Sequence, residues 1–133
     1  MNWTRILGAG LVGGIVVNLV DFVQHGLIMN ATYKKYSDVF TQEQANPVWF
    51  FVISIVVAIF FSILFAKTRE CWAAGVKGGV TYGFWIGMVA FFGNFYFPLV
   101  IDGFPYHLAW CWGGIGVIDA VIGGAVVSLI IKR

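Results

Sequence analysis

Two aspartates, Asp21 and Asp119, lie within long uncharged stretches of the sequence and are the first candidates for chemistry. An aspartate near the centre of a membrane helix carries an insertion penalty of about 2.5 to 3.5 kcal/mol, so it should face protein or water. On a helix Asp21 shares one side with Asn18 and His25, and Asp119 lies beside a row of small residues. We therefore expect both carboxyl groups to point inward, where they can line an ion pathway.

His25 follows Asp21 by four residues, so on a helix the carboxylate can orient the imidazole. His107 lies near the start of the last apolar stretch, on the same predicted side of the membrane. Two histidines at similar depth can ligate a haem iron, or one can hold a chlorin. They can equally assist a quinone or a proton path. The alternative is that each histidine sits at a helix end near the membrane surface without binding a ligand.

Asn94 is a further pocket candidate near the end of the third apolar stretch. Alternatively, Asn94 forms only an interhelical hydrogen bond, which contributes about 0.6 kcal/mol in membrane proteins. The chain has no nucleophilic triad, phosphate-binding loop or zinc motif, and no basic patch for nucleic acid. These residues therefore indicate a binding site or a pathway rather than an enzyme.

The elements that must position these residues are four apolar stretches, at 6–29, 48–66, 78–101 and 108–131. Of the 133 residues 60% are hydrophobic and 11% are charged, compared with about 25% charged in soluble proteins. Each stretch is about as long as the roughly 20 residues that a membrane helix requires, or longer. The sequence predicts an all-α integral membrane four-helix bundle, in which residues 1–133 form one transmembrane domain.

Small residues recur at a spacing of four in every stretch, which places them along one side of each helix. Because burial in lipid brings no hydrophobic gain, membrane helices associate through close backbone contact, and small residues permit it. The predicted packing residues are Gly10 and Gly14; Ser54, Ala58 and Ser62; Gly75, Gly79, Gly83 and Gly87; and Gly116, Ala120 and Gly124. We expect these glycine-zipper faces to pack the helices of the chain, or to dock it onto other subunits.

The connections carry the remaining polar residues. The segment 31–46 has Tyr33, Tyr36 and Phe40 at helical spacing, which predicts a short amphipathic helix on the outer membrane surface. Asn46-Pro47 is typical of a helix cap followed by proline at the first helical position. Most lysines and arginines fall at the end that holds both termini, so both termini are expected in the cytoplasm.

A tandem repeat is a further possibility. Ala9–Ile15 resembles Ala74–Val80, which lies 65 residues later, almost half the chain. Because two stretches separate the copies, repeated two-helix units would share one orientation in the membrane. The alternative is coincidence in a chain with 17 glycines.

In length, four-helix topology and its opening Met1-Asn2-Trp3, the chain resembles small bacterial inner-membrane proteins of unknown function. The resemblance covers the whole length and implies a bacterial inner membrane, but it transfers no functional residues.

Three functions remain open from the sequence. The first is a non-catalytic subunit that packs through its small-residue faces against itself or into a larger membrane complex, of which a bioenergetic assembly is one example. The second is a small homo-oligomeric transporter or channel that uses Asn18, Asp21 and Asp119. The third is a redox subunit that binds haem, a pigment or a quinone through His25 and His107.

Overall fold

The computed structural model describes residues 2–40 and 46–132, and every regular element within them is helical. The long helices are α1 (Trp3–Asp21), which continues into the π-helical segment η1 (Phe22–Ile28), α3 (Pro47–Lys67), α4 (Val76–Gly93) and α6 (Tyr106–Ile130). Shorter helices lie between them: α2 (Asn30–Lys35), η2 (Arg69–Cys71), η3 (Asn94–Tyr96) and α5 (Phe97–Val100).

Four helical segments are long and apolar enough to cross a membrane: Trp3–Ile28, Pro47–Lys67, Val76–Val100 and Tyr106–Ile130. The four predicted apolar helices are thus present as candidate spans, and every end lies within three residues of its prediction. At the start of α3, the residues that cap the helix explain why the sequence predicted its position closely. The side chain of Asn46 accepts a hydrogen bond from the Val48 amide at 3.0 Å, and Pro47 occupies the first turn.

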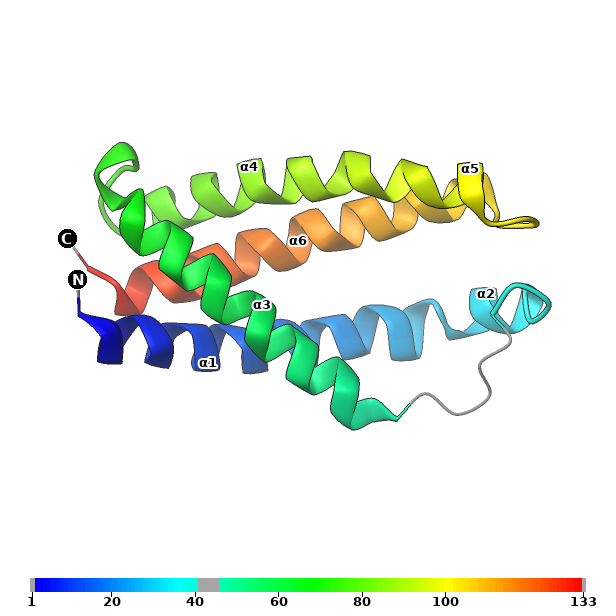
Figure 1. Ribbon diagram of the computed structural model, residues 1–133, viewed down its shortest axis with the longest axis horizontal. Helices are drawn as coiled ribbons and strands as arrows, with labels where there is room; N and C mark the ends of the chain where they lie inside the picture. Colours follow the sequence, from blue (N-terminus) through cyan, green and yellow to red (C-terminus); the bar gives the residue numbers. More distant parts are fainter. Residues whose placement is uncertain (1, 41–45, 133) are drawn as a thin grey trace.

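The four long helices alternate in direction along the chain, so both termini lie at the same end of the molecule (Figure 1). Helix α4 lies along α6, α1 packs against both α3 and α6, and α3 crosses α1 obliquely. The end with the termini is called the terminal half below. The end with α2 and α5 is called the distal half.

Glycines set the contact between α4 and α6. A Cβ atom on Gly79 or Gly83 would overlap the carbonyl oxygen of Gly124 or Ala120, and one on Gly87 would lie 2.8 Å from the Cα atom of Val117. Such distances mean that backbone meets backbone with no side chain between. The predicted small-residue faces of these two helices therefore face each other.

Helix α1 approaches α3 in the same manner. A Cβ atom on Gly10 would lie 2.7 Å from the Cα atom of Ile59, and one on Gly14 would lie 2.9 Å from that of Ile55 and 3.2 Å from the Cβ atom of Ala58. Ser62 is buried in the same half, and its hydroxyl has no hydrogen-bond partner among the described residues. The small residues are thus used within the chain, between helices of the same molecule.

Gly75 and Gly116 depart from the predicted packing faces. A Cβ atom on either would meet no atom within 4 Å. Gly75 instead precedes α4 with a φ of 70°, a backbone conformation that glycine adopts readily and other residues rarely do. Two positions outside the predicted set are crowded instead: Gly113 lies under the ring of Phe91, and Gly78 lies against the carbonyl of Ala73. A spacing of four selects a helix side but does not say which neighbour covers it.

Two apolar clusters occupy the two halves. The terminal cluster consists of Ile6, Ala9, Phe65, Tyr82, Val127 and Ile131. Within it the hydroxyl of Tyr82 donates a 2.8 Å hydrogen bond to the carbonyl of Phe61, which ties α4 to α3. The distal cluster is built around Met29, Phe104 and Leu108. Between the two clusters, along α1 and α6, lie the polar residues described in the next section.

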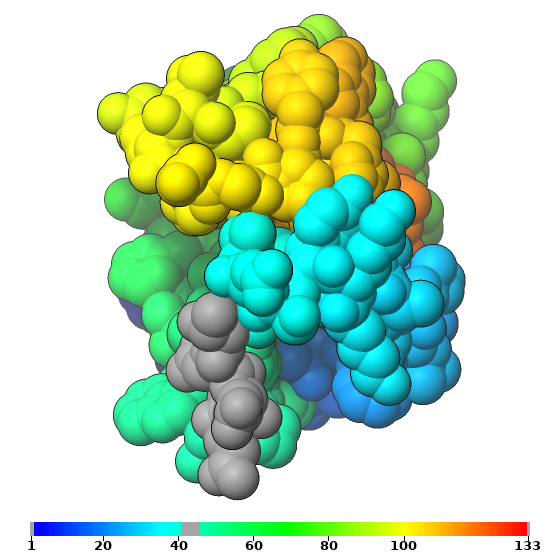
Figure 2. Space-filling view, turned by 90° about the vertical axis from the view of Figure 1, so that its right-hand side faces the viewer, coloured from blue at the N-terminus to red at the C-terminus, as the bar shows by residue number. Residues whose placement is uncertain are grey.

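The segment predicted as an amphipathic helix folds differently. Helix α2 covers only Asn30–Lys35, because Tyr36 leaves helical geometry with φ −110° and ψ 41°. Residues 41–45 of the predicted helix lie outside the described residues. The expected apolar side chains Tyr33, Tyr36 and Phe40 pack against the distal cluster. Figure 2 shows this segment lying against the connection that leads into α6.

The helix contacts bear on the predicted repeat. Gly10 of α1 faces Ile59 of α3, and Gly79 of α4 faces Gly124 of α6. Equivalent positions in α3 and α6 are therefore 65 residues apart, which is the displacement found in the sequence. Those in α1 and α4 are 69 residues apart, one helical turn more. Both helix pairs bring backbones together at glycines, but their registers differ by one turn and only α3 crosses its partner obliquely, so the repeat itself stays a prediction.

Candidate functional site: a polar network in the distal half

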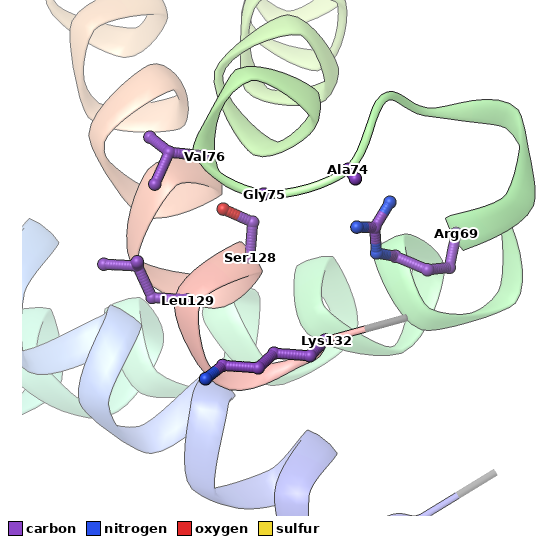
Figure 3. Close-up of a pocket in the computed structure, with 7 residues that line it drawn as sticks. All are labelled: Arg69, Ala74, Gly75, Val76, Ser128, Leu129 and Lys132. Atoms are coloured by element: carbon purple, nitrogen blue, oxygen red, sulfur yellow. The ribbon is translucent and has the colours of Figure 1, made fainter.

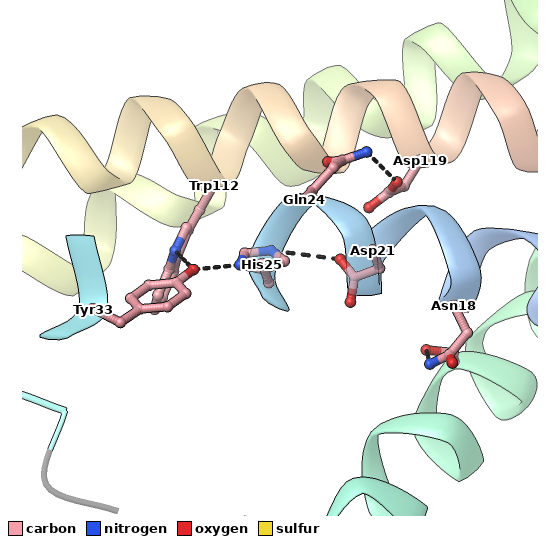
Figure 4. A network of polar contacts seen from close by, with 8 residues as sticks. Asn18, Asp21, Gln24, His25, Tyr33, Trp112 and Asp119 are labelled. Carbon is pink, nitrogen blue, oxygen red and sulfur yellow. Dashed lines mark hydrogen bonds and ion pairs between the residues drawn. The ribbon is translucent and has the colours of Figure 1, made fainter. Parts of the chain in front are cut away.

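A chain of polar side chains runs from the middle of α1 toward the distal surface (Figure 4). It begins at Asn18 and Asp21 in α1 and includes Gln24 and His25 in η1. Helix α6 contributes Asp119 and Trp112, and α2 contributes Tyr33. The network therefore joins the predicted residues of α1 to three different neighbouring elements.

Asp21 and Asp119 meet where α1 packs on α6. Their carboxyl groups are close enough to interact electrostatically, and Nε2 of Gln24 donates a 3.1 Å hydrogen bond to Oδ1 of Asp119. The other amide atom of Gln24, Oε1, is buried without a hydrogen-bond partner among the described residues. The structure brings the two aspartates, which were predicted to face protein or water, to one place, where 36% of the Asp21 side chain is exposed.

His25 connects this acidic pair to the distal surface. Its Nε2 atom lies 3.4 Å from Oδ1 of Asp21, and its Nδ1 atom contacts the hydroxyl of Tyr33. The Tyr33 oxygen also accepts a 2.8 Å hydrogen bond from Nε1 of Trp112. A neutral imidazole with its proton on Nε2 satisfies all of these contacts, with Tyr33 donating to Nδ1. Donors and acceptors then alternate from Trp112 to Asp21.

The π-helical segment explains how Gln24 and His25 reach different partners. In η1 (Phe22–Ile28) the helix is wider than an α-helix, which changes the direction of successive side chains. Gln24 reaches toward Asp119 on α6, whereas His25 lies between Asp21 and Tyr33 (Figure 4). Single-turn π-helices occur often at functional sites, and this one coincides with the centre of the network.

The remaining candidates lie at the edge of the network or outside it. Nδ2 of Asn18 donates a 3.3 Å hydrogen bond to the hydroxyl of Ser54. This bond joins α1 to α3 on the terminal side of the aspartates. Asn94 donates to the carbonyl of Ala90 in its own chain segment at 2.9 Å, so it makes no link between helices there. His107 is exposed and its ring lies against Tyr36, whereas His25 contacts Tyr33 and Trp112.

Sequence reasoning missed Gln24 and did not assign Tyr33 or Trp112 to the site. Gln24 follows Asp21 by three residues, a spacing that puts two residues on the same side of a helix, so its position carried a usable signal. No such signal exists for Tyr33 and Trp112. They join the network only because the chain after η1 folds back over α6.

Electrostatically the network is acidic and lacks a paired cation. Every lysine and arginine in the described residues lies near an end of a long helix or in a connection. About a third of each side chain of Asp21 and His25 is exposed, 36% and 31% respectively. At the distal edge, burial raises the pKa of the Tyr33 phenol above its ordinary value, and the hydrogen bond from Trp112 partly opposes this shift.

Both ring nitrogens of His25 already have partners, Asp21 and Tyr33. Ligation of a haem iron or a chlorin by His25 would have to replace one of these contacts. Among the described residues no group of three His, Cys, Asp or Glu side chains is placed to hold a metal ion. The arrangement is better suited to moving a proton or binding a small cation than to holding a pigment.

Comparison of the chain with protein families, with curated proteins and with solved structures gave no match.

Proposed function

We propose that the protein is a small membrane transporter or channel that binds a proton or a monovalent cation between Asp21 and Asp119. The observation that carries this proposal is the meeting of the two carboxyl groups where α1 packs on α6, at the inner end of a hydrogen-bonded chain. Carboxylates within membrane helices are costly, and proteins that retain them use them in ion and proton pathways.

Two carboxylates side by side repel each other, so the pair favours a positive charge between them. A proton can supply that charge, and so can a cation held by oxygen atoms. Asp21 and Asp119 offer carboxylate oxygens, and the amide of Gln24, which is hydrogen-bonded to Asp119 through Nε2, carries a further oxygen without a partner among the described residues. These hard oxygen ligands suit small hard cations rather than soft metals.

The distal side of the site has a route for protons. His25 can accept a proton on Nδ1 from the Tyr33 hydroxyl and release the proton on Nε2 toward Asp21. The partly exposed Tyr33 then takes a proton from water at the distal surface, and the imidazole returns to its first tautomer before the next transfer. About a third of each of the Asp21 and His25 side chains is exposed, so the site is not sealed by protein.

The terminal side of the site is closed. Beyond the pair formed by Asn18 and Ser54, the backbones of α1 and α3 meet at Gly10 and Gly14, and the terminal cluster follows. Exchange with that side therefore requires α1 to move against α3 or α6. The wide turns of η1 provide a place where the helix can change register.

Flux into liposomes tests this function directly. The protein would be reconstituted with a pH-sensitive dye inside, and a potassium diffusion potential would be imposed. A parallel set with a sodium indicator distinguishes proton from cation flux. The flux through the double variant D21N/D119N should be lower than that of the wild type by a factor of about ten or more. The matched control is D102N, which alters an exposed aspartate in the turn before α6. Equal flux in D21N/D119N and wild type would rule the proposal out, and so would wild-type flux no greater than that of empty liposomes.

The orientation and location proposed from the sequence fit this function. Arg5, Lys67, Arg69, Lys77 and Lys132 lie at the terminal end, whereas Lys34 and Lys35 lie at the distal end. The positive-inside tendency then places both termini in the cytoplasm and the polar network toward the outer side of the proposed bacterial inner membrane.

A groove supports the second candidate, a non-catalytic subunit that packs against itself or into a larger complex. It holds about 320 Å³ between α3 and α4, and its walls are all apolar except for the tyrosine: Val56, Val57, Phe60, Phe61, Leu64, Tyr82 and Ile86. Since the glycine faces are used within the chain, this groove is the surface we propose for docking. The intact mass after gentle extraction decides it. A complex with other polypeptides or a homo-oligomer supports the role, and a lone monomer contradicts it.

A further inference from the structure

A second polar feature lies at the opposite end of the molecule from the network. A pocket of about 290 Å³ opens where η2, the start of α4 and the end of α6 meet. Its walls include Arg69 of η2, Gly75 and Val76 at the start of α4, and Ser128, Leu129 and Lys132 at the end of α6 (Figure 3). None of these residues belongs to the proposed transport site.

Arg69 has an environment that is unusual for a charged residue. It is only 6% exposed, and its guanidinium lies 5.2 Å from the centre of the Phe65 ring. Nη1 donates to the carbonyl oxygens of Trp72 at 3.3 Å and Ala73 at 3.1 Å. Nε is buried and has no hydrogen-bond partner among the described residues. A buried cationic donor without an acceptor is costly, which points to an acceptor supplied from outside the chain.

Figure 3 shows the guanidinium of Arg69 extending from η2 toward Ala74 and Gly75, that is, toward the start of α4 across the pocket. Helix α4 begins there without a side-chain cap and without an acidic residue in its first turn. The first amide groups of a helix have no partner within it, and the helix dipole makes its N-terminus positive. Val76, the first residue of α4, lines the same pocket as Arg69, so the uncapped start of the helix faces the same space.

The lining combines positive charge with apolar walls. Among the described residues that form it, Arg69 and Lys132 are cationic and none is acidic. Val76 and Leu129 supply branched apolar side chains at the ends of α4 and α6, two of the four candidate membrane spans. A site with this composition, placed where membrane helices end, suits an amphiphile with an anionic head.

We propose that this pocket binds the phosphate group of an anionic phospholipid. The phosphate oxygens accept hydrogen bonds from Arg69 Nε and from the first amides of α4, as anions do at helix N-termini. Lys132 adds a second positive charge at the rim. The acyl chains lie along Val76 and Leu129 and continue into the membrane. Inorganic phosphate has the same head chemistry but would leave those apolar walls without a partner.

Native mass spectrometry of the full chain in detergent measures this binding directly. The protein would be titrated with phosphatidylglycerol, with zwitterionic phosphatidylcholine, and with inorganic phosphate. Wild-type protein should bind phosphatidylglycerol more tightly than phosphatidylcholine. R69K retains the charge but loses the Nε donor, and it should weaken phosphatidylglycerol binding about tenfold. K132Q removes an exposed charge and should weaken binding about fivefold. The matched control is K67Q, an exposed lysine at the end of α3 outside the pocket lining.

K132Q and the comparison of the two lipids in wild-type protein keep the proposal testable if R69K does not fold. Equal binding of both lipids by wild type would overturn it. Full phosphatidylglycerol binding in K132Q and in folded R69K would do so as well. Inorganic phosphate that competes with phosphatidylglycerol at equal concentration would show that the site selects free phosphate, and would overturn the assignment to lipid.

Discussion

The terminal and distal halves of the molecule contain the same four long helices but hold them together differently. In the terminal half, backbones meet where Gly10 lies against Ile59 and Gly79 lies against Gly124, and the cluster around Phe65, Tyr82 and Val127 has almost no exposed surface. In the distal half, η1 replaces regular α-helix, and carboxyl, amide and imidazole groups form the contact between α1 and α6.

The two halves are therefore suited to different tasks: one gives a rigid framework, and the other can change its contacts. Close packing without side chains between the backbones gives rigidity, because there is only one way for such surfaces to fit. An acidic pair without a cationic partner lowers the stability of the fold, and packing elsewhere has to offset this loss. The rigid terminal half can thus serve as the base against which the distal part of α1 changes its contacts.

The largest expected effect comes from breaking the backbone contact between α4 and α6 in the middle of the two helices. In G83L the new side chain would have to occupy the space of the Ala120 carbonyl, so the helices must separate. We expect a loss of about 3 kcal/mol or more in unfolding free energy. Unfolding by SDS titration, followed by circular dichroism, measures it. The matched control is G116L, where a Cβ atom meets nothing within 4 Å and stability should change little. Equal losses in the two variants would contradict the assignment of the tight contact.

The next effect has the opposite sign and lies in the distal half. D21N/D119N removes both carboxylates from the contact of α1 with α6 but keeps groups that can accept from Gln24. Because ionisable groups in the membrane are costly, we expect the double variant to gain about 2 kcal/mol while it loses flux. The same SDS titration measures the gain, and D102N again is the control. A double variant that is less stable than wild type would show that the acidic pair holds the fold together.

Two tyrosines, one in each half, are expected to give smaller effects, and Tyr82 of the terminal half gives the larger of the two. Y82F deletes the hydrogen bond from the Tyr82 hydroxyl to the Phe61 carbonyl and leaves the ring in the terminal cluster. We expect a loss of about 1 kcal/mol, the usual value of one such bond. Thermal unfolding of the purified variant measures it, with Y106F as a control because Tyr106 is exposed. No change in Y82F would mean that the hydroxyl contributes nothing to joining α3 and α4.

The smallest effect is a pH dependence at Tyr33. Since burial raises its pKa in the folded protein, the folded state holds the phenolic proton more firmly than the unfolded state. Stability from this group is therefore complete below about pH 10, the ordinary tyrosine value, and decreases as the pH rises toward the folded pKa. Y33F should show a smaller alkaline loss of stability than wild type in unfolding curves recorded between about pH 8 and pH 11. Parallel curves for the two proteins would contradict the shift.

Much of the fold follows from the sequence because the membrane leaves few choices. Apolar stretches of this length must form helices that satisfy their own backbone groups, and Asn46-Pro47 marks one start unambiguously. The aspartates could be placed inward for the same reason, since lipid rejects them. Spacing alone did not distinguish Gly83, which faces α6, from Gly116, which faces open space.

The sequence by itself determined four apolar helices, their ends, and the residues that must avoid lipid, because these depend on length, hydropathy and local hydrogen bonding. Only the tertiary structure decided which residues meet. It joined Asp119 to Gln24 and brought Tyr33 and Trp112, 79 residues apart, to one hydrogen bond. It also placed Arg69 against the start of α4 at the opposite end. These contacts depend on helix crossings and on the π-helical turn, which no local pattern encodes.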